Sequence, residues 1–117
     1  MGARGETTIE TAARAYPFLL TNRALADIEK TLNKSIMVIG QRARDVDFSV
    51  TDTAVILQIG LEYARREQHW STEPVRSPLA FAILDELGFQ PVANAVLQCV
   101  LDVMSYEPKG DADNPPA

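Results

Sequence analysis

Apolar side chains recur at every third or fourth position over most of the chain, and this spacing restricts the fold to a mainly helical one. The periodic pattern starts near Leu25 and continues, with short polar interruptions, to Met104. The interruptions contain residues that start or stop helices, among them the Ser77-Pro78 pair and Gly88. We therefore predict a mainly α fold, a small bundle of about four to five helices.

Capping residues and apolar periodicity set the predicted helix boundaries. The last predicted helix, over residues 91–106, has apolar side chains around most of its circumference. It must therefore be covered on several sides by its own bundle or by another chain. The predicted helices run from Leu25 to Leu32 after a cap at Thr21 or Asn22, from Ile36 to Ala43 after Ser35, from Thr51 to Arg66, from Pro78 to Leu87 after a cap at Ser77 and with Gly88 as a left-handed stop, and from Pro91 to Tyr106.

Residues 6–20 precede the helical pattern and have a different period. Ile9, Thr11 and Ala13 alternate with their neighbours, as do Tyr16, Phe18 and Leu20, which predicts a short N-terminal β-hairpin with one buried face. The turn at residues 12–14 lacks the glycine or asparagine usual in such turns, and Pro17 confines its strand to a sheet edge. A helix over residues 9–16 is the competing interpretation.

The chain of 117 residues has the length of one ordinary domain. We expect residues 1–5 to form a flexible N-terminus, residues 6–106 a single mainly helical domain, and residues 107–117, rich in Pro, Gly, Asp and Asn, a disordered acidic tail.

Charge and composition argue against several classes of protein. The net charge of -5 repels nucleic acid, so we expect no nucleic-acid partner. No apolar run has the length of a membrane span, so we expect no membrane partner. The single cysteine, Cys99, excludes an internal disulfide and a cysteine-cluster metal site.

Residues for catalysis or metal binding are sparse. The only histidine, His69, lies in a polar linker, and Cys99 lies in the most apolar helix, so no nucleophile has an evident base. Asp45 and Asp47 lack the further oxygen ligands of a calcium loop, and the glycines do not form a phosphate-binding loop. We therefore expect no enzyme activity, no cofactor and no metal.

Residues 25–44 resemble a helix-turn-helix in length and have basic residues at their end. Glu29 would stand at the crossing of the two helices, and Asn33 would replace the turn glycine. The would-be recognition helix begins with four apolar residues at 36–39, where base-reading side chains belong. A small DNA-binding regulator is therefore an alternative that the composition disfavours.

With these functions disfavoured, we expect apolar surface residues to bind another protein chain, because aromatic residues, methionines and aliphatic stripes are common at adaptable protein interfaces. Each candidate contact residue also suits the core of a small bundle. The candidates for protein binding, including homo-oligomer contacts, are Met37, Ile39, Tyr63, Trp70, Val96, Val100, Val103 and Met104.

The order of segments resembles that of the phage tail assembly chaperones found in siphophage-like prophages and gene transfer agents. The resemblance covers residues 5–105. This chain departs from the family pattern at two places: it has Asn33 where the family has a glycine, and Ala12-Ala13 where the family has a hairpin turn of Asp-Gly type. The matching segments are Gly5-Glu6, YPFLL at 16–20, NRALADIEKTLNKS at 22–35, IGL at 59–61, and LDELG at 84–88 followed by the apolar helix to Met104.

This resemblance implies a non-enzymatic protein of the bacterial host cytoplasm. Such chaperones bind the tape measure protein and help to recruit tail tube subunits, which implies those two proteins as partners. The alternative from another class is a permanent structural tail or connector protein of a phage-like particle.

Overall fold

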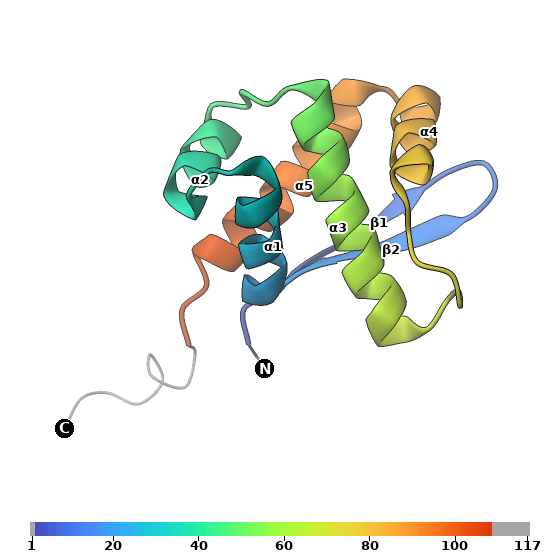
Figure 1. Cartoon of the computed structure of the whole chain (residues 1–117), viewed down its shortest axis with the longest axis horizontal. Coiled ribbons are helices and arrows are strands. Elements are labelled where there is room, and N and C mark those ends of the chain that lie inside the picture. The colour runs from blue at the N-terminus through green and yellow to red at the C-terminus, as the bar shows by residue number, and fades with distance from the viewer. Residues whose placement is uncertain (1, 109–117) are drawn as a thin grey trace.

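Residues 2–108 of the computed structural model are described below, and they form five helices and one N-terminal antiparallel hairpin (Figure 1). The predicted fold class, a small helical bundle with a hairpin, is confirmed. The strands are β1 (Gly5–Glu10) and β2 (Ala15–Leu20), and the helices are α1 (Asn22–Leu32), α2 (Ile36–Arg44), α3 (Val50–Gln68), α4 (Ser77–Leu87) and α5 (Phe89–Met104).

The hairpin forms without a turn glycine because the Thr11 side chain closes the loop. Thr11 Oγ1 donates to the Arg14 carbonyl at 2.8 Å and accepts from the Arg14 amide at 3.2 Å. The Thr11 amide also donates to that carbonyl at 2.9 Å. Glu86 of α4 accepts from the Ala12 amide at 2.6 Å, so the loop is held to a helix. A side-chain hydrogen bond thus replaces the backbone freedom that glycine supplies in other hairpins.

Side-chain caps begin the first three helices, one of them at an unpredicted residue. Ser35 caps α2 as expected, and of the two candidates for α1, Thr21 and not Asn22 is the cap. Each cap accepts from an amide of the first turn. The prediction that Thr51 opens the third helix was wrong, because Ser49 Oγ accepts from the Asp52 amide and α3 starts at Val50. Either hydroxyl suits the sequence, and the backbone conformation of the loop selects Ser49.

The last two helices are joined by one residue, which corrects two expectations. Ser77 is the first residue of α4 and not its cap, since Arg76 holds that position without a side-chain hydrogen bond. Gly88 has φ 92° and ψ 147°, a positive φ outside the left-handed helical region. Gly88 is both the C-cap of α4 and the N-cap of α5, so α5 starts at Phe89, two residues earlier than predicted. Pro91 is tolerated there because first-turn amides have no intrahelical acceptor.

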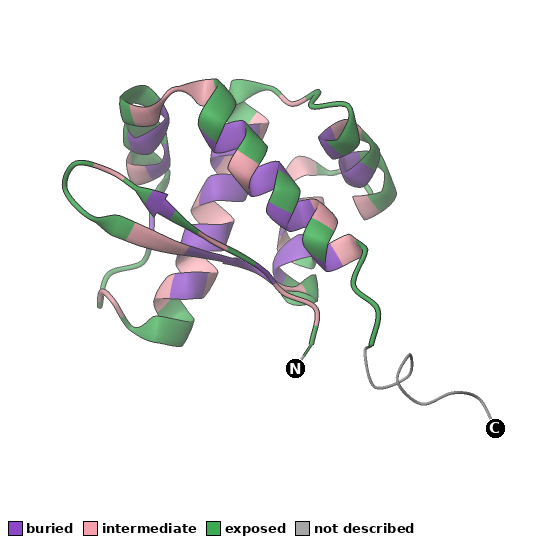
Figure 2. Ribbon diagram, turned by 180° about the vertical axis from the view of Figure 1, so that it is seen from behind, coloured by how far each residue is buried: buried purple, intermediate pink, exposed green. Residues whose placement is uncertain are grey.

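The hairpin packs against the two longest helices, β2 on α3 and β1 on α5. Figure 2 shows the buried segments gathered where these elements meet. Gly60 of α3 lies against the Phe18 ring, and Gly5 lies against the backbone of Cys99 in α5. Both contacts bring backbone close to its neighbour, which only a residue without a side chain allows. One continuous cluster of buried side chains includes residues of both strands and all five helices.

Residues just before the predicted domain start contact the rest of the molecule. Gly5 pairs with Leu20 as the first residue of β1, and Arg4 forms ion pairs with Glu6 at 3.1 Å and Glu67 at 2.6 Å. The folded domain therefore begins one residue before the predicted residue 6, with Gly5. Most of the predicted tail, 109–117, lies outside the described residues.

Candidate protein-binding surface

An open groove with mainly apolar lining residues lies where α1, α2 and the end of α5 meet. Its volume is about 340 Å³. The two helices α1 and α2 contribute their first turns, because each begins beside the last turns of α5. We call this the Met37 groove; its lining residues are Ala3, Asn22, Leu25, Ile36, Met37, Val103, Met104 and Tyr106.

Two methionines give the Met37 groove an adaptable wall. The Met37 side chain is 68% exposed, the most exposed of the large apolar residues described. Met104 is half-buried, and its Cε and Sδ atoms lie against Gly40 of α2. Thioether side chains adjust to irregular apolar partners. The groove therefore suits an apolar protein segment better than a rigid polar ligand.

The predicted contact residues do not form one surface. Met37, Val103 and Met104 line the groove together, although Val103 is only 3% exposed. Ile39, Val96 and Val100 are fully buried in the core cluster. These three are therefore corrected from contact residues to core residues, since a folded chain does not offer them to a partner, whereas Val103 belongs both to the core and to the wall of the groove. Helical periodicity identifies an apolar face without saying what covers it.

Trp70 belongs to a cluster at the hairpin and not to the groove. Its ring meets that of Tyr16 edge to face, with centroids 5.6 Å apart. The Arg14 guanidinium lies 4.7 Å from the Trp70 centroid and 5.0 Å from that of Tyr16. Trp70 Nε1 is buried without a hydrogen-bond partner in the described structure. Cation–π and aromatic contacts thus anchor the α3–α4 linker to the hairpin.

Tyr63 links two helices on another side of the molecule. Its hydroxyl donates to the Asp27 carboxylate, so α3 is tied to α1. Burial, together with this hydrogen bond and the negative charge of Asp27, raises the pKa of Tyr63. Arg66 lies over the Tyr63 ring, 5.4 Å from its centroid. Tyr63 is thus engaged within the fold.

A second groove, which sequence reasoning missed, lies on the other flank of α2. Its volume is about 250 Å³, and Val46 at its edge is 50% exposed. Val46 has φ 51°, a left-handed conformation that a β-branched residue rarely adopts. The available signal in the sequence was a valine between two aspartates in the polar segment after the helix. The lining residues are Ala43, Arg44, Val46, Asn94, Leu97, Gln98 and Leu101.

Side chains that could act in catalysis or bind a metal do not cluster within the described residues. Burial, with lesser effects of Asp102 and Glu6, raises the pKa of Cys99 to about 12, which keeps the thiol protonated near neutral pH. No three His, Cys, Asp or Glu side chains of residues 2–108 gather as metal ligands. None of the helices in this range is both long and apolar enough to cross a bilayer.

The α1–α2 pair has the connection of a helix-turn-helix but exposes apolar side chains. Asn33 takes the left-handed conformation between the helices, with φ 55° and ψ 45°. Asparagine tolerates this conformation better than other residues with a side chain, so it replaces the turn glycine. Met37 and Val38 are exposed on α2, beside Gln41 and Arg44. This surface favours an apolar partner over a DNA groove.

The chain was compared with protein-family models, curated proteins and solved structures. No protein-family model, no curated protein and no solved structure matches it.

Proposed function

We propose that this protein is a tail assembly chaperone of a phage-like particle, which binds the tape measure protein and helps to recruit tail tube subunits. The Met37 groove carries the proposal, because an open groove with mainly apolar lining residues, two of them methionines, suits reversible binding of an amphipathic helix. A tape measure protein exposes long apolar stripes that aggregate unless covered. The net charge of -5 would help to keep the covered complex dissolved.

The groove predicts which side chain a partner needs. We expect Met37→Asp to abolish co-purification of the chain with the tape measure protein encoded in the same gene cluster. The reason is that a carboxylate at the rim must lose its water when an apolar helix docks. Met37 is 68% exposed, so the variant keeps its fold, which circular dichroism and thermal unfolding check.

Val50→Asp is the matched control. Val50 is 50% exposed but lies outside the groove, at the first residue of α3, where a carboxylate also suits the helix dipole. The control should bind as the unaltered chain does. Equal binding by all three proteins would contradict the groove as the docking site. Stoichiometric amounts of the chain in purified particles would instead favour a permanent structural component.

A further inference from the structure

Strand β1 is paired on one side only. Within the described residues its one partner strand is β2. Successive pairs of an antiparallel ladder alternate between hydrogen-bonded and non-hydrogen-bonded ones. Thr8 lies opposite Pro17, which has no amide to donate, and the Thr11 amide donates to the Arg14 carbonyl at 2.9 Å in the same register. Both observations make the pair of Thr8 and Pro17 a non-hydrogen-bonded one.

Every second residue of β1 therefore turns its backbone amide and carbonyl away from β2. These residues are Glu6, Thr8 and Glu10, and all three are exposed. No other residue of the range 2–108 forms a hydrogen bond with their amides or carbonyls. Such an edge can bond to an extended segment of another chain.

A groove of about 160 Å³ lies along this free edge. Thr8 and Glu10 line one side of it, and the end of α4 with the start of α5 lines the other. The second side is apolar and consists of Leu87, Pro91, Val92 and Ala95. We call this the β1 groove; it shares no lining residue with the Met37 groove. Because side chains alternate along a strand, a strand added here would turn every second side chain toward apolar residues.

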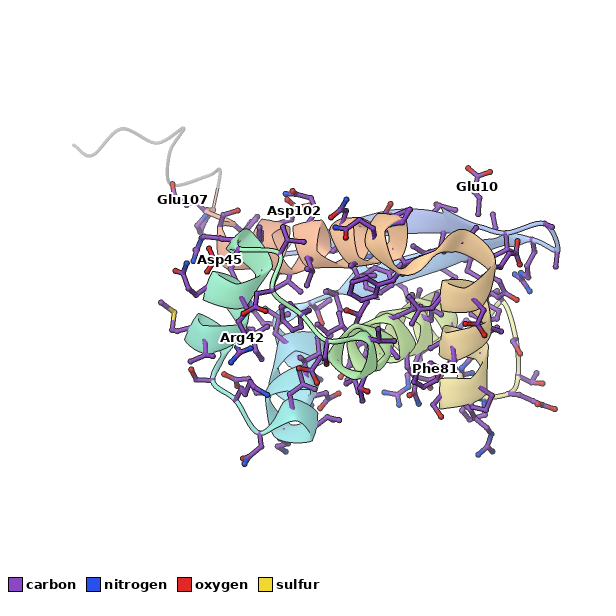
Figure 3. The ribbon with its side chains drawn as sticks, turned by 90° about the horizontal axis from the view of Figure 1, so that it is seen from above. Glu10, Arg42, Asp45, Phe81, Asp102 and Glu107 are labelled. Atoms are coloured by element: carbon purple, nitrogen blue, oxygen red, sulfur yellow. The ribbon has the colours of Figure 1, made fainter. Side chains whose placement is uncertain are left out.

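The free edge is acidic. Glu10 forms no ion pair with another described residue, whereas Glu6 pairs with Arg4 at 3.1 Å. Figure 3 shows Glu10 projecting from the same side of the molecule as Asp102 of α5. A basic side chain opposite Glu10 would complement this charge. The edge therefore favours a basic segment.

A second copy of the chain suits this edge poorly. Two β1 strands that pair about Thr8 would use all three edge residues, but they would set Glu6 of each copy against Glu10 of the other. Like charges directly opposite each other destabilise a strand pair. The occupant is thus a chain of different sequence.

We propose that β1 accepts an extended segment of a partner protein as a third, antiparallel strand. Antiparallel pairs bond straight across and are slightly more stable than parallel ones. The segment has a basic residue opposite Glu10, a polar residue opposite Thr8, and between them an apolar residue that faces the β1 groove. This binding site is separate from the Met37 groove, so it does not depend on the proposed function.

Hydrogen exchange tests the assignment of the free edge. The amides of Thr8 and Glu10 should exchange roughly tenfold faster than those of Thr7 and Ile9, because only the latter donate to β2. NMR spectroscopy of the full chain measures all four. Equal protection of the four amides would overturn the proposal. A dimer that protects Thr8 would assign the edge to a second copy, and would overturn it too.

A fluorescein-labelled peptide, Lys-Val-Thr-Val-Ser, tests binding by fluorescence anisotropy. Its lysine is designed to lie opposite Glu10 and its threonine opposite Thr8. N-methylation of the threonine amide removes the donor to the Thr8 carbonyl and should weaken binding roughly tenfold. N-methylation of the first valine is the matched control. That amide points away from β1, so binding should change less than about twofold.

Thr8→Pro removes the contact from the other side. The Thr8 amide points away from β2, so a proline spares the ladder, as edge strands allow. Peptide binding should fall roughly tenfold. Thr8→Val keeps the amide and should bind as the unaltered chain does, while circular dichroism checks the fold of both variants. Should Thr8→Pro not fold, the two methylated peptides still decide the outcome with the unaltered chain.

Glu10→Lys tests the charge. It should weaken binding of the peptide about threefold, and a peptide with glutamate in place of lysine should bind this variant about threefold more tightly than the unaltered chain. The proposal is overturned by equal effects of the two methylations, by equal binding to the two Thr8 variants, by indifference to the charge at Glu10, or by absence of binding. Met37→Asp should leave peptide binding unchanged, so this proposal and the proposed function fail separately.

Discussion

At the scale of single residues, Gly60 sets how closely α3 approaches the hairpin. A methyl group there would overlap the Phe18 ring. Overpacking of this kind costs about 1–3 kcal/mol, and the better helix propensity of alanine returns about 1 kcal/mol. We therefore expect Gly60→Ala to destabilise the fold by roughly 1 kcal/mol, measured as a lower urea midpoint. Gly2→Ala, which meets no atom within 4 Å, is the control and should leave the midpoint unchanged.

Cys99 reports whether the whole core opens. Its thiol is buried, and its pKa is raised from 9.0 to about 12. We expect iodoacetamide at pH 8 to modify the folded chain roughly a thousandfold more slowly than the chain in urea, because modification needs unfolding. Similar rates in both conditions would contradict this placement of Cys99.

The raised pKa of Cys99 also predicts a slope on the alkaline side. The folded state keeps the thiol proton between pH 9 and about 12, where the unfolded chain loses it, so stability falls as pH rises through this window. Cys99→Ala should remove this contribution.

At the scale of elements, Glu62 ties α3 to the linker before α4. Its carboxylate accepts from Arg65 at 2.7 Å and 2.8 Å, from the Val75 amide at 2.8 Å and from Arg66 at 2.8 Å. The hydrogen bond from Arg65, with those from Val75 and Arg66, lowers the pKa of Glu62 from 4.5 to about 2. Its stabilising effect is therefore present above pH 4.5 and lost as pH falls toward 2.

Glu62→Gln tests this tie. The variant should be less stable than the unaltered chain at pH 7 by on the order of 1 kcal/mol, since charge-assisted bonds near solvent contribute modestly. The difference should shrink as pH falls from 4.5 to 2, as measured by urea unfolding at each pH. Glu73→Gln, in the same linker and outside the ion pairs of the described residues, is the control. A difference that does not vary with pH would contradict the role of the Glu62 charge.

The elements also differ in how well they could be predicted. Ser35 was predicted as a cap, and Thr21 as one of two candidates with Asn22, because polar capping residues stand before the apolar periodic segments. Ser49 and Thr51 both satisfy that rule before α3, so the wrong one was chosen. The hairpin was predicted from its alternation, whereas the Thr11 hydrogen bonds that close it depend on the folded loop.

At the scale of the whole molecule, the hairpin and α3 and α5 form one core to which α4 is added at one end and α2 at the other (Figure 1). Each end is tied to a neighbouring element by a hydrogen bond to a carboxylate. The Ala12 amide of the hairpin loop donates to Glu86 of α4 at 2.6 Å, and the Ile36 amide of α2 donates to Glu29 of α1 at 2.5 Å. The α2 end differs in that the Met37 groove opens there, and this is the reason to look for tape measure binding at that end.

The amino-acid sequence by itself determined the helical class, the hairpin and most of the helix boundaries, because periodicity and caps are local properties of the chain. It also supplied eight apolar candidates for contact, but only the tertiary structure decided their places. Val96 and Val100 became core because the hairpin and α3 cover α5, whereas Met37 stayed exposed because α2 turns only its opposite side to α5. Burial depends on which distant segments meet, and that information is absent from any one segment's pattern.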